Sequence, residues 1–69
     1  MSILKVIEVL AESNESWEAA TKEAVAEASK TVHNIKSICI KEFQAIVEEN
    51  QVVRYRVNAK ISFIVEDKR

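Results

Sequence analysis

The fold is decided by residues 52–65, which read VVRYRVNAKISFIV. Two sets of side chains alternate along this stretch. The apolar set comprises Val53, Tyr55, Val57, Ala59, Ile61, Phe63 and Val65, and the polar set comprises Arg54, Arg56, Asn58, Lys60 and Ser62. Because successive side chains of a strand point to opposite faces, this pattern predicts a strand with one face on a core and a row of cations on the other.

Two further strands are predicted outward from this one. Residues 3–10 are apolar on both faces apart from two charges, which is typical of a strand with neighbours on both sides or one buried in an assembly. Residues 37–47, SICIKEFQAIV, are rich in β-branched and aromatic types and predict another strand. In the connection 48–51, Asn50 is the residue best able to adopt a left-handed conformation, so we expect a hairpin between the last two strands.

One helix is predicted within residues 13–36, SNESWEAATKEAVAEASKTVHNIK. Its apolar stripe recurs at three- or four-residue spacing and consists of Trp17, Ala20, Ala24, Ala28, Thr31 and Ile35. The possible N-caps are Ser13, Asn14 and Ser16. Glu18 and Lys22 are spaced to form a favourable i, i+4 pair. The element order is therefore βαββ, which defines an α+β fold.

The length of the chain indicates self-association. All 69 residues are expected to form a single domain, and with only four aromatic residues its own core must be small. Domains of this size are usually stabilised by disulfides, a metal or partner subunits. The single cysteine, Cys39, excludes an internal disulfide, and one cysteine with one histidine excludes a Cys/His zinc site. Assembly with copies of itself is the remaining way to stabilise the domain. Cys39 itself is expected to be a packed strand residue.

The net charge and the absence of catalytic motifs argue against several classes of function. A net charge of −1 argues against a general nucleic-acid or membrane-surface binder. The apolar start of about eight residues is too short to span a bilayer and is not followed by a small-residue cleavage site, so we expect a cytoplasmic protein. The sequence has no glycine for a phosphate loop and no nucleophile elbow, which argues against an enzyme.

The ordered set of segments resembles the dodecin family. The resemblance is carried by the opening KVIEVLAES (5–13), the capped alanine-rich helix SWEAATKEAVAEASKT (16–31) and the closing FIVED (63–67), and it covers essentially the whole chain. It implies a three-stranded antiparallel sheet wrapped on one helix. It also implies a hollow homododecamer that binds flavins without catalysis, with two subunits building each pocket.

The resemblance also implies where the ligand lies. In flavin-binding members, a Trp at the start of the second strand stacks on the isoalloxazine ring and a Gln in the third strand hydrogen-bonds its polar edge; the corresponding residues here are Ser37 and Arg56. Glu42 lies near a position that is sometimes acidic in the family. Ser37 offers no aromatic surface, but a guanidinium can stack on a ring or hold a phosphate or carboxylate, so riboflavin, FMN and other planar or anionic ligands stay open.

Each of these features has an alternative. The cations Arg54, Arg56 and Lys60 can form a salt-bridged strand face, a ligand or subunit interface, or a nucleic-acid surface. RNA is disfavoured because Tyr55 and Phe63, the aromatic residues of this strand, lie on its apolar side. The carboxylates that could pair with the cations are Glu8, Glu12, Glu42 and Glu66.

A second function is also compatible with the sequence. The chain could form a structural shell that has lost flavin and binds a metal ion or a phosphorylated metabolite instead. Glu48 and Glu49, repeated by symmetry, could then supply oxygen ligands for a hard cation. Trp17 is expected to pack in the core and not to replace the missing stacking residue.

Overall fold

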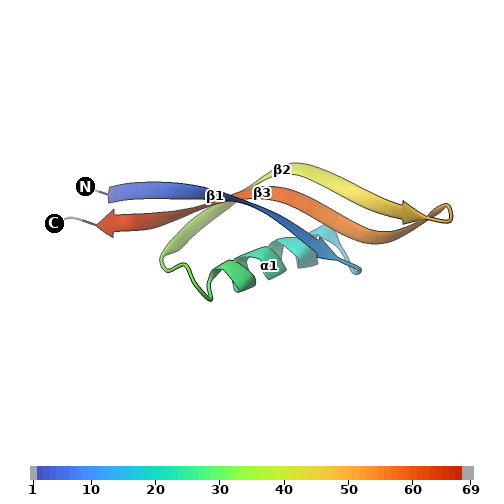
Figure 1. Ribbon diagram of the computed structural model, residues 1–69, viewed down its shortest axis with the longest axis horizontal. Helices are drawn as coiled ribbons and strands as arrows, with labels where there is room; N and C mark the ends of the chain where they lie inside the picture. The colour runs from blue at the N-terminus through green and yellow to red at the C-terminus, as the bar shows by residue number, and fades with distance from the viewer. Residues whose placement is uncertain (1, 68–69) are drawn as a thin grey trace.

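The computed structural model describes residues 2–67, and the side chains of residues 3–65. Its elements are β1 (Ser2–Ser13), α1 (Trp17–Ala28), β2 (Ile35–Glu48) and β3 (Gln51–Asp67), which confirms the predicted βαββ order. The strands form an antiparallel sheet in the order β1-β3-β2, and α1 lies against one face of it (Figure 1). The described residues contain no helix with the length and apolar character needed to cross a membrane.

β3 is the central strand, and its apolar set faces α1. Val57, Ala59 and Ile61 are fully buried there, and Ala20 and Ala24 of α1 complete the core. Small helical side chains let the helix backbone approach the sheet closely, so few atoms lie between the two layers. The core is therefore as small as the composition predicts, and the face of β3 that carries the cations has no helix over it.

The start of α1 follows its predicted signals. Ser16 is the N-cap, and its hydroxyl accepts a hydrogen bond of 2.9 Å from the Ala19 N–H. The Glu18 carboxylate lies 3.6 Å from the Lys22 ammonium, as the i, i+4 spacing predicts. Both side chains of this pair are well exposed, so the pair adds little, and the cap fixes where the helix begins.

We expect Ser16→Ala to lower the free energy of unfolding by about 1 kcal/mol, because one N–H of the first helical turn loses its acceptor. Urea denaturation followed by circular dichroism measures the change. Ser29→Ala is the matched control, since the Ser29 hydroxyl only donates back to the Ala26 carbonyl at the other end of the helix. Equal losses in the two variants would contradict the capping role.

The prediction that the helix continues past Ala28 is wrong. The Thr31 N–H bonds the Ala28 carbonyl at 3.2 Å in a tightened turn, and Asn34 takes a left-handed φ of 62°. Ile35, expected on the helical stripe, instead pairs with Phe63 at the start of β2. The physical reason is that the segment after Ala28 is rich in β-branched and polar residues of low helix propensity, while the sheet ladder offers Ile35 a partner.

The β2–β3 hairpin forms as predicted and extends beyond α1 (Figure 1). Its two turn residues, Glu49 and Asn50, both have positive φ, 52° and 65°, which matches the twist of the flanking strands. In β2 the register shifts between Ile40 and Glu42. The extra residue in this bulge moves the helix-facing positions from even to odd numbers, which explains why the alternation of this strand looks loose in the sequence.

β1 is an edge strand, because it pairs only with β3. Its side chains that point away from α1 include Leu4, Val6 and Leu10, which are 55%, 52% and 66% exposed. The sequence left two interpretations of this strand, neighbouring strands on both sides or burial in an assembly. Within a single chain the first is excluded, because β1 has a neighbour on one side only. Cys39 on β2 is also exposed, so the prediction that it is packed is wrong for the single subunit.

Candidate functional site

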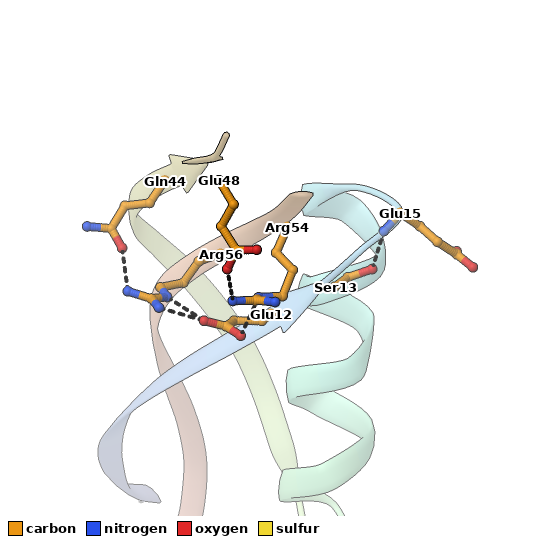
Figure 2. A network of polar contacts seen from close by, with 7 residues as sticks. All are labelled: Glu12, Ser13, Glu15, Gln44, Glu48, Arg54 and Arg56. Atoms are coloured by element: carbon orange, nitrogen blue, oxygen red, sulfur yellow. Dashed lines mark hydrogen bonds and ion pairs between the residues drawn. The ribbon is translucent and has the colours of Figure 1, made fainter. Parts of the chain in front are cut away.

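A cluster of charged and amide side chains lies on the helix-free face of the sheet, toward the hairpin (Figure 2). We call it the arginine cluster, and it consists of Glu12 from β1, Gln44 and Glu48 from β2, and Arg54 and Arg56 from β3. Arg56 is directly opposite Glu12 on one side and Gln44 on the other. Since directly paired residues of an antiparallel sheet point to the same face, the register itself brings these three side chains together.

Glu12 is the centre of the cluster. One of its carboxylate oxygens, Oε2, accepts a hydrogen bond from Arg56 Nε at 2.8 Å and lies 2.6 Å from Arg56 Nη2. The other oxygen, Oε1, lies 3.4 Å from Arg54 Nε. On the far side, Arg56 Nη1 donates a long bond of 3.5 Å to the side-chain oxygen of Gln44. Glu12 therefore bridges both arginines. Of the predicted carboxylate partners it is the one that pairs with the cations across strands, since Glu8 and Glu42 form no ion pair with the described residues.

The Glu12–Arg56 pair is the strongest ion pair of the cluster. Their side chains are 37% and 33% exposed, against 77% and 79% for Lys22 and Glu18 on the helix. Partial removal from water reduces the screening of the attraction, and the short contacts hold the guanidinium in one orientation. The Arg54–Glu48 contact is longer, at 3.8 Å, and Glu48 is 62% exposed, so this pair is weaker.

The turn after β1 holds Glu12 in place. The Ser13 hydroxyl accepts a hydrogen bond of 2.9 Å from the Glu15 N–H, so the chain turns toward α1 directly after Glu12. The Glu15 side chain points away from the arginine cluster (Figure 2).

Two buried polar atoms on this face have no hydrogen-bond partner among the described residues, Arg54 Nε and Asn58 Oδ1. The first still lies 3.4 Å from the Glu12 carboxylate, so its charge is paired although the bond is not well aligned. Asn58 is the next residue along this face of β3 after Arg56. Unpaired buried polar atoms cost about 1 to 3 kcal/mol each, and for Asn58 Oδ1 the described residues supply no donor.

The three predicted site residues do not meet within one subunit. Arg56 lies in the arginine cluster, and Glu42 is opposite Asn58, one position farther along the same face. Ser37 is opposite Ser62, with the two hydroxyls hydrogen-bonded at 2.5 Å. Ser62 is six positions after Arg56 on β3, which is about 20 Å of strand. The structure brings Glu42 and Arg56 to one region and leaves Ser37 at a distance.

Trp17 packs on the opposite face of the hairpin, but it is 36% exposed and outside the core, so the prediction that it is a core residue is wrong for the single chain. Its ring meets Tyr55 and Phe43 edge-on, with centroids 4.9 and 5.9 Å apart, and its Nε1–H donates to the Gln44 carbonyl at 2.9 Å. It therefore fixes the backbone that carries Gln44 while the Gln44 side chain turns toward Arg56. Trp17 does not take part in the arginine cluster.

The sequence-predicted metal ligands are not gathered in one subunit. Glu48 faces Arg54, and Glu49 is a residue of the turn. In the part of the chain that the structure describes, no group of three or more His, Cys, Asp or Glu side chains is arranged to hold a metal ion. The side chain of Glu66, another predicted partner of the cations, lies outside the described residues.

Fold and site together define a βαββ chain with the arginine cluster on the sheet face that no helix covers. A model of the dodecin family matches residues 3–66. The chain therefore belongs to the dodecin family, as its resemblance predicts.

Individual relatives agree with this assignment. The chain is 35% identical over 63 residues to the calcium dodecin of Mycobacterium tuberculosis, covering 91% of this chain and 89% of that protein. Among solved structures, a point mutant of the Thermus thermophilus dodecin is 30% identical with a TM-score of 0.90, covering 97% of this chain and all of that one. The crystal structure of the M. tuberculosis calcium dodecin, described as having a novel calcium-binding site, is 31% identical with a TM-score of 0.83, covering 99% and 97%.

Proposed function

We propose that the protein forms a hollow homododecamer that binds and stores a planar ligand of the flavin type in pockets between subunits, without catalysis. Membership of the dodecin family supports this proposal. So do the apolar side chains of β1 that one subunit leaves exposed, because a subunit with so small a core gains most by covering them with another copy. The observation that carries the proposal is Arg56, a partly buried and oriented guanidinium on the open face of the sheet.

A pocket that contains all the predicted residues requires two subunits. Ser37 and Arg56 are too far apart on one chain to touch one ring, so Ser37 of one subunit would face Arg56 and Glu42 of another. In this arrangement the flat face of the guanidinium stacks on the ring, and the small Ser37 side chain leaves room for it. The Glu42 carboxylate, beside them, is an acceptor for a ring N–H.

Arg56→Ala is expected to weaken riboflavin binding about five- to tenfold, which lies between the values for an exposed and a fully desolvated cation–π contact, because Arg56 is partly exposed. The measurement is the quenching of riboflavin fluorescence on titration with micromolar protein. Lys60→Ala is the matched control, because Lys60 is a cation on the same face of β3, four residues farther along, and should leave the affinity unchanged. Absence of quenching by the wild-type protein would remove flavin as the ligand.

A second candidate function is the binding of a divalent cation. It is favoured by the similarity to a protein named calcium dodecin. Because Glu48 already faces Arg54, a cation held by Glu48 and Glu49 would need further oxygen ligands from another subunit. Native mass spectrometry of the purified protein, with and without added Ca²⁺, distinguishes the two functions, because it reports the number of subunits and the mass of the bound ligand together.

A further inference from the structure

We infer that Glu12 sets the ligand class of the Arg56 site, so that the site selects an uncharged planar ring, as in riboflavin, over the same ring carrying a phosphate, as in FMN. The inference rests on the proposed function, which places a planar ligand at Arg56. It concerns the charge that this ligand carries.

The arginine cluster is electrically balanced. Arg54 and Arg56 contribute two positive charges, and Glu12 and Glu48 contribute two negative charges, so its formal sum is zero. A phosphate group at pH 7 carries a charge between about −1.5 and −2. When the ring stacks on Arg56, this phosphate is subject to the field of the Glu12 carboxylate as well as that of the guanidinium, since Glu12 Oε2 lies 2.8 Å from Arg56 Nε. Attraction to one group is then offset by repulsion from the other.

Three of the five N–H donors of Arg56 are also engaged. A guanidinium holds a phosphate with two parallel N–H groups from one edge of its plane. Its Nε and Nη2 edge is turned to Glu12 Oε2, and Nη1 reaches toward Gln44 on the opposite strand (Figure 2). The flat faces of the plane are not used by these in-plane bonds. Arg56 therefore offers a ligand its flat faces and two remaining N–H groups, one on Nη1 and one on Nη2, while its Nε and Nη2 edge is held by Glu12.

The register of the sheet keeps these residues together. Glu12, Arg56 and Gln44 are directly opposite one another on three hydrogen-bonded strands, so the carboxylate stays near Arg56 whatever its rotamer. The second oxygen of Glu12 faces Arg54. The charge of Glu12 therefore belongs to the same part of the sheet as Arg56.

The test compares riboflavin and FMN, which share one ring system and differ by the phosphate. Their dissociation constants are measured by fluorescence quenching at low salt, and the ratio of the FMN value to the riboflavin value cancels the contribution of stacking. We expect this ratio to exceed one in the wild-type protein and to fall about fivefold in Glu12→Gln, because one negative charge near the phosphate is removed. Glu8→Gln is the matched control, with the same charge change on the same face of β1, and should leave the ratio unchanged.

Gln44→Glu tests the inference independently if Glu12→Gln does not fold. It adds a carboxylate on the other side of Arg56 with almost no change of shape, so the ratio should rise. If the wild-type protein binds FMN more tightly than riboflavin, or if neither variant changes the ratio while both ligands bind, the inference is overturned and the proposed function stands. If neither ligand binds the wild-type protein, both are overturned.

Discussion

Replacing Leu10 with lysine is expected to dissociate the proposed homododecamer into subunits. Leu10 is the most exposed of the large apolar residues on the helix-free face of β1, at 66%. Covering a leucine side chain contributes about 1.5 to 3 kcal/mol, and a lysine at the same place would bring an unpaired charge into the contact. Because each copy in a closed assembly repeats the change, its effects accumulate.

Sedimentation velocity measures the result. The wild-type protein is expected at about 94 kDa, twelve subunits of 7.8 kDa, and Leu10→Lys at the mass of the subunit or of small oligomers. Ala26→Lys is the control, because Ala26 is an exposed helical residue that contributes only a methyl group to the surface. A wild-type protein that sediments as a folded single subunit, or a Leu10→Lys variant that keeps the full mass, would contradict the proposed shell.

Ile61→Ala is expected to lower the free energy of unfolding by about 2 to 4 kcal/mol. Ile61 is fully buried at the centre of β3, between α1 and the sheet, and the small core has few side chains that could move into the cavity. A protein of this size has a total stability of only about 5 to 15 kcal/mol, so the loss is a large part of it.

Urea denaturation at fixed protein concentration measures this loss. Ile61→Val serves as the graded control, since it removes one methylene group and should cost about 1 kcal/mol. If Ile61→Ala were no less stable than Ile61→Val, burial of the Ile61 side chain would not be a main contribution to the free energy of unfolding.

The sequence predicts most of the fold because its signals are local. The alternation of residues 52–65 identifies the central strand and both of its faces, and Asn50 identifies the turn. The interaction that ends α1 is not local. Thr31 and Ile35 continue the helical spacing, and only pairing with Phe63, 28 residues later, makes Ile35 part of a strand. Competition between helix and sheet for one residue is decided by tertiary contacts.

The site is less predictable, since it depends on register. Glu12 is among the carboxylates proposed to pair with the cations, but its choice of Arg54 and Arg56 follows from the pairing of strands 44 residues apart. Gln44 carries no signal of its own, because the bulge after Ile40 sets which face it occupies. The role of Ser37 stays a prediction, because a pocket that includes it needs a second subunit.

The strand order β1-β3-β2 has a consequence for synthesis of the chain. β2 and β3 are joined by a two-residue turn and can pair as soon as both have left the ribosome, whereas β1 is made before both and its partner is β3, the last of the three strands. Until β3 has been made, the apolar residues of β1 have no strand to pair with and are open to association with other nascent chains. Pairing with β3 therefore ends the most aggregation-prone state of β1, and rapid closure of the sheet shortens that state.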